Sequence, residues 1–529
     1  MKKIMAIILL LLVVLMGCQD TTKTQTEILP DQDKVDNVEM IISIIDSDIT
    51  LEDKDEIARI RAEYEKLTEA EKALVENYDI LENAEAIIAG IEAENAKTNE
   101  VIEKAKKQID EMIPDAVEDD LVFPSTLETE IGEVKLVWGI KDPNTITKTG
   151  QVIQGRRTIN VEIMTTIIIN NKRFATSQMV AVKPIQFEKL PTNRLSFGYY
   201  YNGSNFTGFP EEALETLDVV NYAFATVVNG EVNVYPLSSK DAVLKARKSG
   251  VRIVMCIGGY ANEAIPFSKA ASTQEGREKL AASIVEAVET YHFDGVDIDW
   301  EYPGYYDSPE YSIDPAVDKV NYTLFMTELR KQLKAANSDY ILSAAVPAGD
   351  AKSRFEISKL NGILDYFHLM TYDMDSSGVS THHTALYSSS NSGWSAAGTV
   401  DEYVRLGASK SKLVLGAAFY GREFDLVTKG NVIRAQATAK RSINYRYIKT
   451  EYIDLIGNGV TRYWDDVAKA PYLYKEATNQ VVVYDDEESI AYKAKYVIDE
   501  GLAGMMFWEY SQDNGDLLKA IYENLVKER

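Results

Sequence analysis

The stretch "FDGVDIDWEYP", Phe293–Pro303, places three carboxylates on alternate positions of an apolar run. Side chains alternate across a β-strand, so Asp297, Asp299 and Glu301 share one face while the apolar residues between them take the other. We call these three acids the carboxylate row. Like charges crowded in a low-dielectric interior raise the pKa of at least one carboxyl. A carboxyl that stays protonated near pH 7 can act as a general acid, so the row indicates a catalytic strand.

This strand is one of eight apolar runs that alternate with helical stretches from about residue 193 onward. The alternation favours right-handed βαβ units and a parallel sheet. Eight units predict a TIM (β/α)8 barrel over 193–527, an α/β fold whose chemistry lies at the carboxyl ends of the strands. Residues 424–492 carry strands of their own and predict a small α+β insertion domain. The runs are "RLSFGYYY", "DVVNYAFATV", "VRIVMCIGG", "FDGVDIDWE", "YILSAAVPAG", "LDYFHLMTYDMD", "KLVLGAAFYG" and "LAGMMFWEYS".

The residues alone leave several interpretations of the carboxylate row open. A metal site could use three acids, although no histidine sits in or next to the row and Mg²⁺ or Ca²⁺ sites usually draw on loop oxygens. A purely structural hydrogen-bond network is a second interpretation. A glycosidase with two carboxylates, one of them across the sugar from the acid, is a third.

A resemblance to a known family favours one mechanism. "FDGVDIDWEYP" resembles the DGxDxDxE motif of the family 18 glycoside hydrolases, the chitinase superfamily, and the match covers 193–527. The segments "NYAF", "IGG", "MTYD", "FYGR" and "MFW" lie where the family has them, and 424–492 resembles the chitinase insertion domain. The resemblance implies retaining hydrolysis of β-1,4-linked N-acetylglucosamine polymers without metal or cofactor. Family 18 enzymes use the substrate's own acetamido group in place of a carboxylate nucleophile.

The same resemblance implies roles for individual residues. Glu301 would protonate the glycosidic oxygen and later activate water. Asp299 would orient the acetamido nitrogen, Asp297 would share a proton with Asp299, and Tyr372 would hold the acetamido carbonyl. Trp508 would form the apolar floor under the sugar. The expected substrate-binding residues are Tyr199, Phe224, Gly258, Gly259, Trp300, Met370, Asp373, Tyr420, Arg422 and Trp508.

The third run departs from the family at one position. The family usually has Ser-x-Gly-Gly, and this chain has Cys256-Ile-Gly-Gly. In the family that serine hydroxyl helps to bind the innermost aspartate, and a thiol is a weaker donor. The departure therefore bears on the coupling between Asp297 and Asp299 and on the pH optimum.

The first residues are typical of an export signal. A basic start precedes an apolar run that is shorter than a membrane span and ends at Cys18. Residues 1–17 resemble a bacterial lipoprotein signal peptide, which implies cleavage before Cys18, lipidation of its thiol and anchoring on the outer face of the bacterial cell membrane. A plain secretory signal or a short anchor helix are the alternatives. With Cys18 lipidated, Cys256 has no partner for a disulfide.

Two further modules are expected before the barrel. Residues 18–36 read as a flexible spacer and 37–100 as an all-α module, which resembles the helical repeats of bacterial surface proteins. Thr68 and Glu71 match a capping box within it. Strand-period runs with turns between them predict an all-β sandwich over 110–188, which resembles a bacterial immunoglobulin-like domain. We expect a spacer role for the sandwich, and the resemblance of the helical module implies either a spacer or an interaction module.

The net charge of −26 limits the possible partners. It argues against a nucleic-acid partner and against docking on anionic lipid through basic patches. The expected partner is a chitin-like polysaccharide or another glycan containing N-acetylglucosamine, bound by a monomer. Two alternatives to a chitinase remain: an endo-β-N-acetylglucosaminidase acting on N-glycans or cell-wall glycan, and a lectin that binds glycan without cleaving it.

Overall fold

The computed structural model describes residues 29–129, 132–201, 211–235, 237, 240–260, 264–305, 312–430, 432–527 and 529. The expected signal peptide, Cys18 and the first part of the spacer lie outside these residues. Among the helices of the described ranges, none has the length and hydropathy that a membrane span requires. The chain divides into two compact units, one holding the helices up to residue 108 and the other holding most of the remaining chain.

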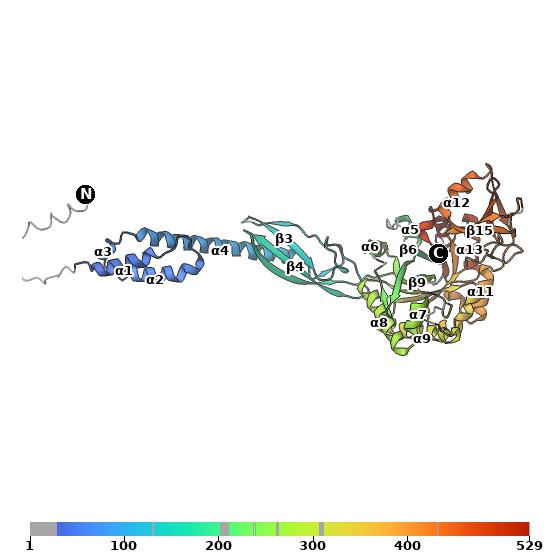
Figure 1. The fold of residues 1–529 in the computed structure, drawn as a ribbon, viewed down its shortest axis with the longest axis horizontal. Helices are drawn as coiled ribbons and strands as arrows, with labels where there is room; N and C mark the ends of the chain where they lie inside the picture. The colour runs from blue at the N-terminus through green and yellow to red at the C-terminus, as the bar shows by residue number, and fades with distance from the viewer. Residues whose placement is uncertain are drawn as a thin grey trace, which may run out of the picture. The chain divides into compact units, whose positions relative to one another are not determined.

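The first unit is helical, as predicted for this part of the chain (Figure 1). Its core includes Val35, Ile42, Ile60 and Leu81, each at most 2% exposed. The capping box of Thr68 and Glu71 forms at the start of α3 and confirms that prediction. The last helix ends at Met112 rather than near residue 100, because Pro114 is the first residue that opposes its continuation. The helices are α1 (Gln32–Ser43), α2 (Lys54–Tyr64), α3 (Glu69–Lys72) and α4 (Tyr78–Met112).

The expected sandwich is replaced by a single sheet. Strands β1 to β5 form one layer in the order β1-β5-β4-β3-β2. Loop residues Ile146 and Val152, joined by one isolated bridge, pack with Val161 and Val180 on one face, where a second sheet was expected. The turn residues of 141–158 keep that segment irregular, which the strand pattern alone does not reveal. The strands are β1 (Ala116–Val117), β2 (Thr126–Thr129), β3 (Gly132–Ile140), β4 (Ile159–Ile169) and β5 (Lys172–Val182).

The predicted barrel is confirmed, and its strands coincide with the eight apolar runs. Each strand pairs in parallel with the next, and β6 pairs with both β7 and β19, which closes the barrel. The short β8 (Glu231–Asn233) forms a hairpin with β7. The barrel strands are β6 (Leu195–Tyr201), β7 (Val219–Val228), β9 (Arg252–Tyr260), β10 (Gly295–Glu301), β11 (Ile341–Pro347), β12 (Tyr366–Met370), β13 (Leu413–Ala418) and β19 (Gly504–Trp508).

Helices surround this barrel and bury the outward faces of its strands (Figure 1). On β10, Val296, Ile298 and Trp300 are fully buried against them. The carboxylate row on the alternate positions therefore faces the barrel interior, as the strand period predicts. The principal helices are α5 (Glu211–Thr216), α6 (Lys240–Lys248), α7 (Ala264–Ala271), α8 (Gln274–Thr290), α9 (Pro315–Ala336), α10 (Ile357–Leu360), α11 (Ala396–Arg405), α13 (Glu487–Asp499) and α14 (Asp516–Ile521).

An insertion domain lies between β13 and β19. Its antiparallel sheet has the order β15-β14-β18-β17-β16. The sheet begins at Tyr420 rather than at residue 424, so Tyr420 and Arg422 belong to its first strand and not to the barrel. The elements are β14 (Tyr420–Leu426), β15 (Ala437–Asn444), α12 (Tyr445–Glu451), β16 (Val460–Asp465), β17 (Ala470–Lys475) and β18 (Gln480–Val483).

The last residue lies at the amino-terminal end of the barrel strands. The Arg529 guanidinium pairs with the carboxylate of Asp218, which directly precedes β7. It also donates a hydrogen bond of 3.1 Å to the carbonyl of Arg194, which directly precedes β6. The carboxyl ends of the strands, where the chemistry of such barrels lies, are at the opposite end.

Candidate active site

A pocket of about 400 Å³ opens at the carboxyl ends of the barrel strands. Its wall combines residues of the barrel with Tyr420 from the insertion domain. The structure brings most of the predicted site residues together there. The predicted residues that line the pocket are Tyr199, Phe224, Asp299, Glu301, Met370, Tyr372, Asp373, Tyr420 and Trp508.

The carboxylate row runs from the barrel interior to this pocket. Asp297 is fully buried and does not line the pocket, Asp299 is 3% exposed at its base, and Glu301 is half-buried on its wall. Glu301 is the residue of the row that lies closest to the open mouth. The order of depth along the row is the order that strand alternation predicts.

Asp297 receives hydrogen bonds from several strands. Its carboxylate accepts from the Tyr199 hydroxyl at 2.7 Å, the Ser343 hydroxyl at 2.6 Å and the Cys256 thiol at 3.1 Å. The Nδ1 atom of His368 lies 3.4 Å away. Burial raises the pKa of Asp297, but His368 and the hydrogen bonds from Ser343 and Tyr199 outweigh burial and hold the pKa below its usual value. Asp297 is therefore the ionised member of the row.

The pKa values of Asp299 and Glu301 are raised, in contrast to the lowered pKa of Asp297. Burial, followed by the charges of Glu301 and Asp297, raises the pKa of Asp299 well above its usual value. Burial raises the pKa of Glu301 to about 7, and the charge of Asp373 acts in the same direction. Hydrogen bonds with Tyr302 and Asp299 lower the pKa of Glu301 in part. The Asp299–Glu301 pair consequently retains a proton at neutral pH, as a general acid requires.

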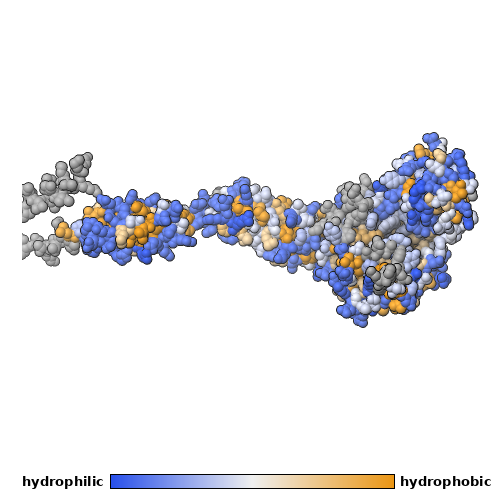
Figure 2. All heavy atoms as spheres, viewed as in Figure 1, coloured by the Kyte–Doolittle hydropathy of each residue, from blue (hydrophilic) through white to orange (hydrophobic). Residues whose placement is uncertain are grey.

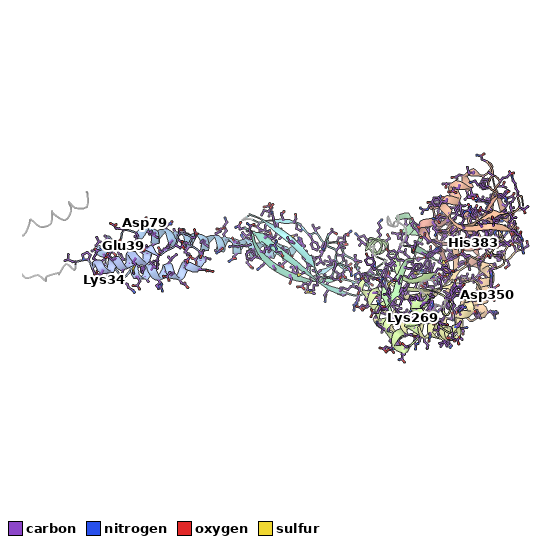
Figure 3. The ribbon with its side chains drawn as sticks, in the orientation of Figure 1. Lys34, Glu39, Asp79, Lys269, Asp350 and His383 are labelled. Atoms are coloured by element: carbon purple, nitrogen blue, oxygen red, sulfur yellow. The ribbon has the colours of Figure 1, made fainter. Side chains whose placement is uncertain are left out.

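The opposite wall of the pocket carries a fixed negative charge at Asp373. The Arg422 Nε atom donates to Asp373 at 2.9 Å, and His383 Nδ1 lies 3.8 Å from the same carboxylate oxygen. Burial raises the pKa of Asp373, but the neighbouring His383 and the charge of Arg422 hold it well below its usual value. The charge of Asp373 adds to burial, the larger cause, in raising the pKa of Glu301. Figure 3 labels His383 within the barrel unit.

Aromatic rings form the floor of the pocket. The Trp508 ring stacks on Phe224 with 5.6 Å between centroids and lies 5.6 Å from Tyr199. Tyr201 lies 6.3 Å from the same indole. An apolar floor beside a few polar groups is the usual composition of a small-molecule site.

Some predicted residues act behind the pocket and do not line it. A Cβ atom on Gly258, where φ is +126°, would lie 2.0 Å from the carbonyl oxygen of Asp299. A Cβ atom on Gly259 would lie 3.0 Å from the Phe224 ring. Both glycines therefore permit close packing of pocket residues. Arg422 reaches the pocket only through Asp373.

Trp300 corrects the sequence analysis. It was expected to bind substrate, but its fully buried ring stacks on Phe267 at 5.1 Å and lies 5.5 Å from Tyr322. These contacts place it between the barrel and the outer helices. The alternation that points the carboxylate row inward necessarily points Trp300 outward.

The pocket also contains residues that sequence reasoning missed. Tyr302, Trp394, Asp350 and Asp375 line it, and His368 lies beneath it. His368 lies two positions before Met370 on β12, so strand alternation places the two side chains on one face. Tyr302 directly follows Glu301, and alternation would place it on the opposite face, so strand spacing does not predict it. Trp394 comes from a loop, and Asp350, labelled in Figure 3, begins a short 3-10 helix after β11. Neither segment has a period long enough to predict the direction of a side chain.

Three peptide bonds beside pocket residues are in the cis form, and none of them is a bond to proline. They are Ala223–Phe224, Glu301–Tyr302 and Trp508–Glu509. They lie within β7 and at the carboxyl ends of β10 and β19.

Comparison with known proteins relates the barrel to one family. Chitinase A1 of Niallia circulans is 34% identical over 309 residues, which are 52% of this chain and 42% of that protein. Chitinase B of Serratia marcescens is 29% identical over 421 residues, 63% of this chain and 81% of that protein. The chain thus spans less than half the length of Chitinase A1 but most of Chitinase B.

Solved structures give the same relationship. A family 18 N-acetylglucosaminidase from Paenibacillus barengoltzii is 35% identical, with a TM-score of 0.57, and is matched over 63% of this chain and 100% of its own. The chitinase ChiW from a Paenibacillus species, described as a cell-surface-expressed multi-modular enzyme, is 30% identical with a TM-score of 0.57, over 70% of this chain and 36% of that one.

The sequence profile of the family described as "Glycosyl hydrolases family 18" matches residues 196–513, more than half of the chain. That range contains the insertion domain and the carboxylate row. It also contains all the barrel strands, apart from the first residue of β6. By this match and by the geometry of its pocket, the chain belongs to glycosyl hydrolase family 18.

Proposed function

We propose that this protein hydrolyses chitin or chitooligosaccharides, the β-1,4-linked polymers of N-acetylglucosamine, with retention of configuration. One observation carries the proposal. Glu301, with its pKa raised to about 7, lies on the wall of an aromatic-floored pocket and is supported from below by Asp299. The curated relatives named above are chitinases, which supports this substrate class.

The proposed reaction uses the substrate's own acetamido group. Its carbonyl oxygen attacks the anomeric carbon while Glu301 transfers its proton to the departing glycosidic oxygen. Asp299 bonds to the acetamido N–H, and the Tyr372 hydroxyl donates to the acetamido oxygen. Glu301, now ionised, then removes a proton from the water that opens the cyclic intermediate, so the acid is restored.

A second substrate pattern has specific support. The Paenibacillus barengoltzii relative, matched over its whole length, is named an N-acetylglucosaminidase, which favours removal of single sugars from chain ends. Action on N-glycans or cell-wall glycan is a further alternative. Product analysis on chitooligosaccharides of defined length, a glycoprotein and peptidoglycan separates these possibilities.

Glu301→Gln tests the proposed chemistry. The amide keeps the shape of the side chain but has no acidic proton, so turnover of chitooligosaccharides should fall by about 10²–10⁴-fold while their binding persists. Glu278→Gln, at an exposed position of α8, is the matched control and should behave like the parent protein. Near-normal turnover by Glu301→Gln would reject Glu301 as the acid.

We also propose that the protein is exported and held on the cell surface as a monomer, by lipid on Cys18, with the helical module and the sheet as spacers. The apolar run that ends at Cys18 supports this location. The likeness to a cell-surface-expressed chitinase agrees with it. Cys18→Ser should move the protein from the membrane fraction to the medium or block its processing. Unchanged fractionation and processing would contradict lipid anchoring.

A further inference from the structure

A fully buried histidine on β12 lies beneath the pocket and contacts Asp297 without lining the pocket itself. The Nδ1 atom of His368 lies 2.9 Å from the Tyr199 hydroxyl oxygen, 3.1 Å from Asn221 Nδ2 and 3.4 Å from Asp297 Oδ1. On its other side the imidazole packs on the Phe197 ring, with 4.8 Å between centroids. One ring nitrogen therefore faces the polar centre of the barrel.

The surrounding hydrogen bonds place a hydrogen on that nitrogen. Tyr199 has one hydroxyl proton, and it is donated to Asp297 at 2.7 Å. Nδ1 cannot accept the same proton, so it either accepts from Asn221 Nδ2 at 3.1 Å or carries a hydrogen of its own. Asn221 favours the second assignment, because its Oδ1 atom is buried without a partner among the described residues. Exchanging the amide oxygen and nitrogen of Asn221, which are nearly indistinguishable by shape, turns Oδ1 into an acceptor that shares Nδ1–H with Asp297 Oδ1.

Cys256 faces the same carboxylate from β9. Its thiol lies 3.1 Å from Asp297 Oδ2, the oxygen that also accepts from Tyr199. Burial and the charge of Asp297 raise the pKa of the thiol well above its usual value, so it remains a donor. Sulfur is a weak donor, so Cys256 contributes little toward holding a negative charge.

We propose that His368 and Cys256 are coupled positioning residues. The Cys256 thiol on β9 is a weak donor, so the Nδ1–H of His368 is needed to keep Asp297 ionised. The proton of the carboxylate row then remains on Asp299 and Glu301. The inference rests on the proposed hydrolysis. The other groups that face Asp297 are Tyr199 from β6, Ser343 from β11, Tyr322 from α9 and Asp299 on its own strand. Among the described groups named here, His368 is the one that presents a ring N–H toward Oδ1 of Asp297, at 3.4 Å.

The contact between His368 and Asp297 should affect the acid limb of the pH profile of kcat/KM. When Asp297 takes up a proton, it is no longer the anion of the carboxylate row. The proton that Asp299 and Glu301 share at neutral pH is then no longer confined to those two residues. A hydrogen bond donated to the ionised form of a carboxyl lowers its pKa. Without His368, Asp297 should therefore become protonated at a higher pH.

Four proteins test the coupling: the parent, His368→Asn, Cys256→Ser and the double variant. His368→Asn should move the acid limb of kcat/KM upward by about one pH unit, with KM on the plateau little changed. Cys256→Ser restores a strong donor, so the shift caused by His368→Asn should be smaller in that background. An unmoved limb in His368→Asn overturns the role of His368. A shift of equal size in both backgrounds overturns the coupling. Thermal unfolding verifies folding, and His368→Gln replaces a variant that fails it.

A measurement without substrate separates this inference from the proposed function. The chain has four histidines, so ¹⁵N-histidine labelling gives few signals, and His368→Asn assigns the one of interest. The inference expects a protonated Nδ1 in the parent protein at neutral pH. A bare Nδ1 overturns it. A protonated Nδ1 in a protein that cleaves no N-acetylglucosamine polymer leaves the hydrogen-bond assignment standing and rejects the proposed function instead.

Discussion

Glu301 is held at the boundary between its two protonation states. Burial raises its pKa, hydrogen bonds with Tyr302 and Asp299 lower it, and the resulting pKa is about 7. A general acid works only while it is protonated, so hydrolysis should decline as the pH rises through about 7. The sign follows from the raised pKa: the protonated form predominates below this value and is lost above it.

Tyr302→Phe tests this balance at a single residue. Removing its hydroxyl deletes a hydrogen bond that lowers the pKa of Glu301, so the basic limb of kcat/KM should move to higher pH by a few tenths of a unit to about one unit. Tyr305→Phe, at a half-exposed tyrosine nearby, serves as the control. A limb that stays in place or moves to lower pH would contradict the assignment of Glu301.

The sequence predicts residues along one strand better than contacts between strands. Alternation alone orders Asp297, Asp299 and Glu301 by depth, because neighbours on one strand have fixed directions. The contact of His368 with Asp297 joins strands β12 and β10, which are far apart in the sequence. No spacing along the chain encodes that distance, so His368 was missed.

At the scale of elements, β9 and β10 approach each other closely because β9 ends in glycines. At Gly258 a Cβ atom would collide with the Asp299 carbonyl oxygen, and φ of +126° is unfavourable for other residues. The sequence predicted both strands. Their closeness depends on the closed barrel, and so does the division of "GAAFYGREFDL" between β13 and β14.

Gly258→Ala should therefore strain both strands. We expect the free energy of unfolding to fall by about 1–3 kcal/mol and turnover to fall with it, because Asp299 must move. Urea unfolding and kcat measure the two effects. Gly362→Ala is the control, since the added Cβ atom there meets only the Lys359 carbonyl oxygen at an ordinary 3.5 Å. Equal stability of the two variants would contradict the steric argument.

At the scale of the whole molecule, the helical unit has a hydrophobic core of its own. Figure 2 shows a mostly hydrophilic face with scattered apolar side chains on each unit. The sequence predicted the helical and barrel parts from their periods. It failed at the sheet of residues 116–182, because the loops that cover one face have no period to read.

Leu81→Ala, in the fully buried core of the helical unit, tests this independence. The cavity should lower the stability of that unit by about 2–5 kcal/mol without changing kcat/KM. The five tryptophans, at positions 138, 300, 394, 464 and 508, all belong to the second unit. Tryptophan fluorescence should therefore keep its unfolding midpoint, while part of the circular dichroism signal at 222 nm is lost earlier. A joint shift of both signals would show that the units unfold together.

Arg529 contacts the Asp218 carboxylate and the Arg194 backbone carbonyl, and these contacts have a practical consequence for protein engineering. The polypeptide enters and leaves the barrel at neighbouring points, on the side away from the pocket. A short linker between residues 529 and 194 could close the barrel into a ring, which could then be reopened in another loop as a circular permutant. For the same reason, immobilisation through the last residue leaves the mouth of the pocket unobstructed, so a solid polymer could still reach Glu301.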